Sequence, residues 1–114
     1  IFLFYKEKLE ILPGVSMNPE PEDCINGAWM PTVVFDENTG ITREKLQQEF
    51  AEENIDARVF FWPLSSFDMF EDVPKNYIAW SLPNKSLNLP SYHDLSLNDL
   101  ENVCSVIVNN FMPD

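Results

Sequence analysis

Apolar side chains recur at helical spacing at both ends of the chain. This spacing predicts one helix over residues 1–12, which ends at Pro13-Gly14, and another over residues 96–111. Ser96 suits the N-cap of the second helix, and Asp99 stands at the N3 position of a capping box. Each helix should pack on a core through one apolar face. These faces consist of Ile1, Tyr5, Leu9 and Leu12 in the first helix and of Leu97, Leu100, Cys104, Ile107 and Phe111 in the second.

The first half of the chain continues with a loop, a strand and a helix. Residues 18–27 are rich in Pro, Asn and acidic side chains, which is typical of a loop. A strand is predicted over residues 29–35, because a turn sequence follows it. Thr42 is a suitable N-cap for a helix that runs to about Asn54, with Leu46 and Phe50 on its apolar side.

The second half contains two more predicted strands, separated by an unusual loop. The first strand occupies residues 57–62 and ends at Pro63, and the second occupies residues 84–89. Residues 64–72 are too apolar for a solvated connector, so we expect them to cover another surface. Pro74 suits the first turn of a short helix that Pro83 ends. The apolar side chains of this region are Leu64, Phe67, Met69 and Phe70 in the loop and Tyr77, Ile78 and Leu82 in the helix.

Together these elements predict an α+β fold. We expect a mixed or antiparallel sheet of three or four strands, with helices packed on one face. The chain has 114 residues, of which 45% are hydrophobic and 13% aromatic, and this is enough for one core and one domain spanning residues 1–114.

The charge balance is strongly acidic, because seven basic residues face 19 acidic ones and the net charge is −12. This composition argues against nucleic-acid binding and against binding to an anionic membrane surface, since both need clustered Lys and Arg. The sequence also has no apolar run of the roughly 20 residues that a membrane-spanning helix requires. It predicts no metal site, because His93 has no second ligand at a useful spacing. Cys104 should be a structural thiol and Cys24 a surface thiol, without a disulfide.

The strand over residues 57–62 carries the candidate binding residues. Side chains on a strand alternate, so Arg58, Phe60 and Trp62 would share one face. The opposite face, with Ala57, Val59 and Phe61, should be core. An arginine sunk between aromatic rings needs an anionic partner, such as a carboxylate or a phosphate. In the alternative interpretation, Arg58 reaches an exposed edge and pairs with the nearby Glu52 or Asp56.

Four segments of this chain follow one another in the order and spacing of a known enzyme family. They are residues 29–35 (Trp-Met-Pro-Thr-Val-Val-Phe), residues 42–46 leading to 54–58 (Thr-Arg-Glu-Lys-Leu to Asn-Ile-Asp-Ala-Arg), residues 60–64 (Phe-Phe-Trp-Pro-Leu) and residues 88–91 (Asn-Leu-Pro-Ser). Each segment alone is unspecific, but the ordered set resembles the C-terminal domain of the DegT/DnrJ/EryC1/StrS family. Members of that family are pyridoxal-phosphate-dependent aminotransferases that act on nucleotide-linked keto sugars. The resemblance covers nearly the whole chain.

The resemblance implies a small C-terminal domain of the aspartate-aminotransferase-like (fold type I) architecture, entered by the helix over 1–12 and closed by the helix over 96–111. It also implies a cytoplasmic homodimer that takes an amino group from a donor such as glutamate. The substrate-binding residues would be Arg58, Phe60, Trp62 and Ser65, near the nucleotide-sugar entrance or the dimer seam. Many family members have histidine at the position of Ser65, so the role of that histidine does not carry over.

The chain itself should contribute no catalytic residue and no covalent link to pyridoxal phosphate. The family binds the cofactor through a lysine of its large domain, and the five lysines here stand in charged or turn-rich contexts. The chain also begins in a helical pattern without Met, so we expect it to be part of a longer protein.

Two other functions remain open at this point. The first is a stand-alone acidic module that binds a protein partner through the aromatic side chains Phe60, Trp62, Phe67 and Phe70. The second is an unrelated hydrolase that uses His93 with Asp94.

Overall fold

The computed structural model describes residues 1–112, and within them four α-helices accompany a four-stranded antiparallel sheet with the strand order β1-β2-β4-β3. The helices are α1 (Phe2–Leu9), α2 (Arg43–Glu52), α3 (Tyr77–Ser81) and α4 (Leu97–Val108). The strands are β1 (Val15–Met17), β2 (Thr32–Phe35), β3 (Arg58–Val59) and β4 (Ser86–Asn88). The predicted α+β class is therefore confirmed. No helix in residues 1–112 is long and apolar enough to cross a membrane.

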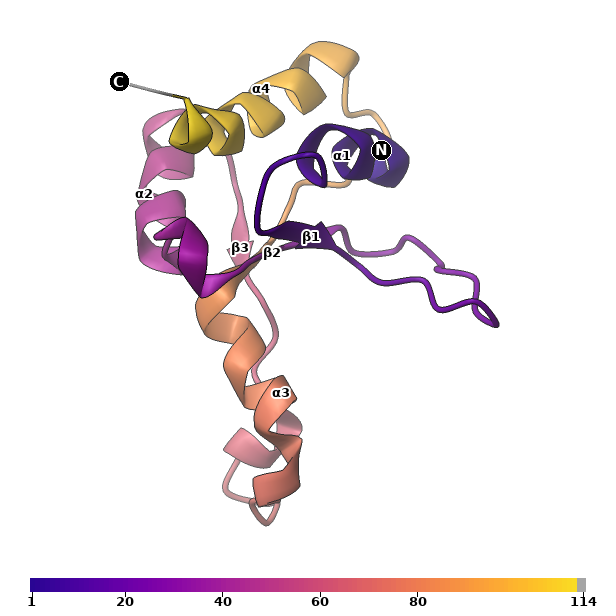
Figure 1. Ribbon diagram of the computed structural model, residues 1–114, viewed down its shortest axis with the longest axis vertical. Helices are drawn as coiled ribbons and strands as arrows, with labels where there is room; N and C mark the ends of the chain where they lie inside the picture. Colours follow the sequence, from indigo (N-terminus) through magenta and orange to yellow (C-terminus); the bar gives the residue numbers. More distant parts are fainter. Residues whose placement is uncertain (113–114) are drawn as a thin grey trace.

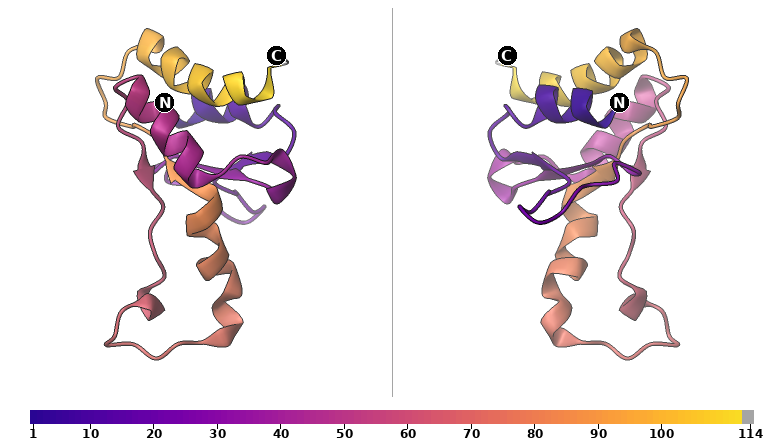
Figure 2. Two further views of the ribbon diagram at one scale, coloured as in Figure 1. Left: turned by 90° about the vertical axis from the view of Figure 1, so that its left-hand side faces the viewer. Right: turned by 90° about the vertical axis from the view of Figure 1, so that its right-hand side faces the viewer.

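Helices cover one face of the sheet, as predicted. Figures 1 and 2 show α1 and α4 side by side above the sheet, with α2 beside them. The core lies between these layers, because each helix turns its apolar stripe toward the strands. The largest side chains that are almost completely buried come from both layers: Tyr5, Leu9, Leu46, Phe50 and Ile107 from the helices, and Val33, Phe35 and Leu87 from the strands.

The helices begin where local side chains satisfy free backbone amides. Thr42 Oγ1 accepts a hydrogen bond from the amide of Lys45 at 3.2 Å, so it caps α2 as predicted. Ser96 Oγ accepts from the amide of Asp99, whose carboxylate accepts in turn from the amide of Ser96, and this completes the predicted capping box of α4. The helix α2 ends at Glu52, and Asn54 follows in the left-handed conformation with φ of 57°.

Some predicted boundaries and faces are wrong. Leu97 is 61% exposed at the start of α4, and Ile1 is exposed just before α1, so neither belongs to the buried face predicted for its helix. Strand β2 begins at Thr32, which leaves Trp29 outside the sheet. Strand β1 was not predicted, because its three residues are too few for an alternating pattern to stand out.

The predicted strand over residues 57–62 is also too long, since β3 comprises two residues paired with Leu87 and Asn88 of β4. Beyond Val59 the chain does not pair further with β4, although Ser86 of β4 would stand opposite Phe60 in the same register. It therefore leaves the sheet.

The segment between β3 and β4 extends away from the body of the molecule. We call residues 60–85 the arm, with an outgoing limb over residues 60–72 and a returning limb over residues 73–85 that contains α3. Figure 2 shows the two limbs pointing away from the sheet, on the side opposite α1 and α4. The arm exposes seven large apolar side chains beyond its base: Leu64, Phe67, Met69, Phe70, Val73, Tyr77 and Ile78. Residues 64–72 were predicted to cover another surface, and within residues 1–112 their large apolar side chains are themselves exposed.

Candidate functional site

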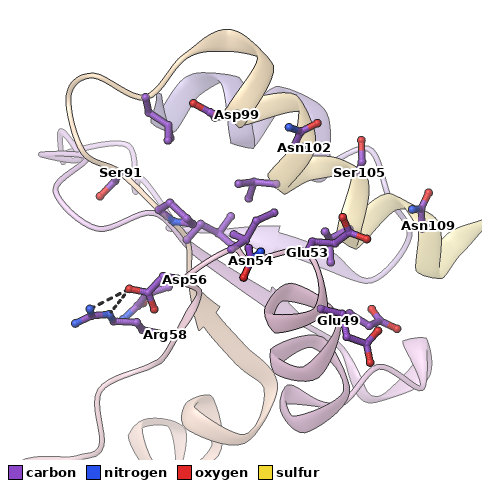
Figure 3. Close-up of a pocket in the computed structure, with 18 of the residues that line it drawn as sticks. Glu49, Glu53, Asn54, Asp56, Arg58, Ser91, Asp99, Asn102, Ser105 and Asn109 are labelled. Atoms are coloured by element: carbon purple, nitrogen blue, oxygen red, sulfur yellow. Dashed lines mark hydrogen bonds and ion pairs between the residues drawn. The ribbon is translucent and has the colours of Figure 1, made fainter.

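An open groove of about 1450 Å³ lies next to β3. Its walls come from the C-terminal end of α2, from α4 and from the segment over residues 88–92. Apolar side chains, including Ile55, Leu95, Val103 and Val106, line its interior. Figure 3 shows polar side chains along both rims, from Glu49 on α2 and Glu53 just after it to Asn102 and Ser105 on α4. Apolar and polar side chains therefore line the groove together.

The charge of this groove is mainly negative. Its lining includes five carboxylates, from Glu49, Glu52, Glu53, Asp56 and Asp99, against two cations, from Lys45 and Arg58. A phosphate group would be repelled by most of this surface. Only the end at β3, where Arg58 is located, offers a cation with a planar fork of donors.

Arg58 is exposed in this structure and pairs within its own chain. Its side chain is 77% exposed, and its Nη2 and Nε donate to Oδ2 of Asp56 at 2.9 and 3.2 Å. The hydrogen bond to Asp56 raises the pKa of the Arg58 guanidinium above its ordinary value, so Arg58 stays charged. The prediction that Arg58 is sunk between aromatic rings is therefore wrong for this chain, and the alternative partner Asp56 is the one observed. The reason is that β3 is an edge strand, and its outer side faces solvent.

The aromatic residues after β3 do not form the predicted pattern of one core face and one binding face. Phe61, expected in the core, is 53% exposed and stacks on Trp29, with ring centroids 6.1 Å apart and planes 3° apart. Val59 is also exposed. Phe60 is half-buried and tilts against Phe61. Phe60 and Phe61 lie beyond the two-residue strand and line the same small hollow, so the alternation predicted for a strand over residues 57–62 does not extend to them.

Trp62 has a contact that the sequence analysis missed. Its ring lies 5.6 Å from the guanidinium carbon of Arg43, at the first turn of α2, which is a cation–π distance. Arg43 also donates from Nη1 to the backbone oxygen of Pro83 at 3.2 Å. No sequence signal indicated this contact, because residues 43, 62 and 83 are about 20 positions apart in different predicted elements.

Ser65 lies inside the outgoing limb of the arm. Its hydroxyl oxygen is buried and has no hydrogen-bond partner among the described residues, and the same is true of Trp80 Nε1 on α3. Leaving a buried polar atom without a partner costs free energy. Of the four predicted binding residues, only Arg58 lines the large groove. Phe60 borders a second hollow of about 260 Å³ beside Trp29, Trp62 contacts Arg43 at the base of the arm, and Ser65 follows Leu64 farther along the outgoing limb.

The lysines of the chain do not provide a site for a Schiff base with pyridoxal phosphate. Among residues 1–112 no lysine is buried: Lys8, Lys45 and Lys75 are exposed, and Lys6 and Lys85 are half-buried. A lysine that reacts as a free amine usually owes its lowered pKa to burial or to a neighbouring cation. The residues present therefore do not fit the covalent site of this cofactor.

The remaining reactive side chains are separate from the groove. His93 Nε2 lies 3.1 Å from Asp94 Oδ1, but both side chains are at least 80% exposed and neither lines the groove. Cys24 is exposed and Cys104 is buried, and both are free thiols, as predicted. No group of three His, Cys, Asp or Glu side chains suited to hold a metal ion occurs in the described part of the chain.

Comparison with known proteins agrees with this architecture. The chain is 31% identical over 111 residues to GDP-perosamine synthase of Escherichia coli O157:H7, and this match covers 96% of the chain and 29% of that protein. The crystal structure of DesI with its TDP-sugar product has a TM-score of 0.74 at 22% identity, covering 93% of this chain and 28% of that one. A GDP-4-keto-6-deoxymannose-3-dehydratase, solved with a trapped PLP-glutamate geminal diamine, has a TM-score of 0.69 at 12% identity, with 91% and 28% covered.

The chain spans about 30% of the length of the curated relatives that it matches. At these identities the two solved structures establish the fold, which the four-stranded sheet and its helices share. A model of the DegT/DnrJ/EryC1/StrS aminotransferase family matches residues 1–108, which is nearly the whole chain. This chain therefore belongs to the DegT/DnrJ/EryC1/StrS aminotransferase family.

Proposed function

We propose that this chain is the small C-terminal domain of a longer pyridoxal-phosphate-dependent aminotransferase. The enzyme would transfer an amino group from an amino acid, which we expect to be glutamate, to a keto sugar linked to a nucleotide. The observation that carries this proposal is the family match over residues 1–108. The relative from Escherichia coli, whose name includes a nucleotide-linked amino sugar, supports the substrate class.

The cofactor would be held by a part of the enzyme outside this chain, because the lysines here do not fit a Schiff base. When bound, pyridoxal phosphate supplies the electron sink for moving the amino group. The trapped adduct in the dehydratase of the same fold supports the choice of cofactor. The residues of this chain would contribute shape and charge, and none would act as a nucleophile.

Within this domain we propose that Arg58 and the arm face the substrate entrance or the seam between two subunits. Arg58 is charged and exposed, so exchanging Asp56 for a phosphate of the substrate would require no unfolding of the sheet. Phe60 and Trp62 would line the entrance, and Ser65 would gain a hydrogen-bond partner that it lacks in the isolated chain. The exposed apolar side chains of the arm would be buried by the rest of the enzyme or by a second subunit of a homodimer. We place this enzyme in the cytoplasm, without a nucleic-acid or membrane partner.

The test is an assay of the full-length protein that contains this chain. Purified with pyridoxal phosphate and supplied with glutamate, it should convert a nucleotide-linked 4-keto sugar to the amino sugar, detected by mass spectrometry. A matched reaction without glutamate should give no product. Absence of amination for both GDP-linked and TDP-linked keto sugars would contradict the proposal.

A second candidate function is an acidic module that binds a protein partner through the arm. The exposed Phe67, Met69 and Phe70 favour it, because an uncovered apolar surface of this kind marks an interface. The two functions differ in where the arm is covered. Hydrogen exchange in the full-length enzyme should show the arm protected without any added protein if the aminotransferase proposal is correct, and unprotected if the arm awaits a separate partner.

A further inference from the structure

The arm is attached to the body of the molecule only near its base. Residues 82–85, a short 3₁₀ segment at the end of the returning limb, pack against α2, β2 and β4, and Pro83 is buried there. Residues 66–79 are all exposed. Figure 1 shows the same arrangement, with α3 far from the other helices. The direction of the arm is therefore decided by a few contacts at the base.

Arg43 contacts both limbs at this base. Its guanidinium carbon lies 5.6 Å from the centroid of the Trp62 ring on the outgoing limb. Its Nη1 donates to the backbone oxygen of Pro83 on the returning limb at 3.2 Å. The remaining donors, Nε and Nη2, are directed to Oε1 of Glu44 at 3.1 and 2.6 Å. The side chain of Arg43 is 16% exposed, although the residue begins a surface helix.

The chemistry of a guanidinium suits this arrangement. Its flat face can lie on an aromatic ring while its edge donates hydrogen bonds in the same plane, which the ammonium of lysine cannot do. Partial removal from water strengthens the contact with the ring. Helix α2 is fixed in the core through Leu46 and Phe50. Arg43 therefore links a rigid element to both limbs of an arm that has almost no core of its own.

We propose that Arg43 is a positioning residue that sets the direction in which the arm leaves the sheet. It acts through Trp62 and Pro83, and it has no contact with the groove. A small rotation at the base becomes a large displacement at the tip of the arm. Arg43 would thereby control how the arm meets the substrate entrance, and this second step rests on the proposed function.

The first experiment measures amide hydrogen exchange in the full-length enzyme, independently of activity. Arg43→Ala and Trp62→Ala should each speed exchange at the base of the arm by roughly two- to thirty-fold, the range expected for a partly buried cation–π contact. Thr42→Ala is the matched control, because it removes the cap of the same helix without touching the arm. It should speed exchange in residues 43–52 and leave the arm unchanged. Equal exchange at the base of the arm in Arg43→Ala and wild type, or equal effects of Arg43→Ala and Thr42→Ala, would overturn the positioning role.

Arg43→Lys keeps the charge and the helix but cannot satisfy Trp62 and Pro83 together. It should loosen the base of the arm by less than Arg43→Ala does, and it provides the answer if the alanine variant fails to fold. If amide exchange in the arm is as slow in Arg43→Lys as in the wild type, the positioning role does not require a guanidinium.

The second experiment tests the effect on the reaction. Arg43→Ala should raise the KM for the keto sugar by roughly two- to thirty-fold through the same contact, while the rate of the half-reaction with the amino donor stays unchanged. Thr42→Ala should leave both values unchanged. A faster exchange of the arm with an unaltered KM for the sugar would support positioning and overturn its link to the substrate entrance. If the enzyme aminates no sugar at all, the proposed function fails, and the exchange data still decide the role of Arg43.

Discussion

Thr32 donates its hydroxyl hydrogen to Oδ1 of Asn88 over 2.8 Å, inside the sheet between β2 and β4. Both residues are 5% exposed, and they stand opposite each other in the strand register. Asn88 Nδ2 in turn donates to the backbone oxygen of Val59 at 3.4 Å, so one side chain connects three strands. This connection holds the short edge strand β3, and with it Arg58, at the end of the groove.

Removing both members of the Thr32–Asn88 pair should destabilise the sheet by less than the two single changes add up to. Thr32→Val leaves Asn88 Oδ1 without its partner, and Asn88→Leu leaves the Thr32 hydroxyl without its acceptor in β4. We expect each single change to lower the free energy of unfolding by about 1 to 3 kcal/mol. The double variant should lose less than the sum of the two. Urea denaturation of the 114-residue chain measures all three, and strictly additive losses would contradict a coupled pair.

Arg58 should matter for substrate use and hardly for stability. Because its side chain is 77% exposed, Arg58→Ala should leave the free energy of unfolding almost unchanged. In the full-length enzyme we expect kcat/KM for the nucleotide sugar to fall by roughly 30-fold to 1000-fold, since a charged hydrogen-bonding partner of the substrate is lost. Arg58→Lys should recover little, because a point charge cannot reproduce the planar fork. Lys45→Ala, which removes the other cation of the groove, is the control. Steady-state kinetics with wild-type values for Arg58→Ala would refute the assignment.

Cys104 should make the stability of the chain depend on alkaline pH. Burial raises the pKa of the Cys104 thiol from 9.0 to about 11. The folded state thus favours the protonated thiol, so its contribution is complete below pH 9 and is lost as the pH rises from 9 to 11. Over this window the wild-type chain should lose on the order of 1 kcal/mol per pH unit more than Cys104→Ala does.

Urea denaturation under reducing conditions at pH 7.5, 9 and 10 measures this difference. Cys24→Ala removes the exposed thiol instead, and it should follow the wild type. Parallel pH profiles for Cys104→Ala and wild type would show that the buried thiol does not titrate as expected.

The arm should make the isolated chain associate with itself. Burial of apolar surface is worth about 25 cal/mol per Å², so covering a few hundred Å² favours association. The net charge of −12 opposes association, and added salt should therefore promote it by screening. Phe67→Ser with Phe70→Ser should shift sedimentation toward monomer. Leu3→Ser removes an apolar side chain outside the arm that is even more exposed than Phe67 and Phe70, and it should have no such effect. A wild-type chain that sediments as a monomer at high concentration and high salt would contradict this prediction.

The sequence by itself determined the features that depend on near neighbours. The caps at Thr42 and Ser96 each need a polar side chain three residues before the amide that it satisfies, and such spacing is visible in one dimension. The buried faces of α2 and α4 follow from helical periodicity in the same way, as with Leu46 and Ile107. The ordered motifs also identified the family, because their spacing along the chain is itself the signal.

Only the tertiary structure decided which predicted faces are covered. Alternation indicates that Phe61 and Trp62 point to opposite sides, but whether either side meets a core depends on which elements of the fold pack against it. Strand β3 stops at Val59, one position before it would stand opposite Ser86 of β4, and the arm begins there. The exposure of Arg58 and its pairing with Asp56 follow from that edge position. The contact of Arg43 with Trp62 and Pro83 joins three segments that are distant in sequence, and folding alone brings their side chains together.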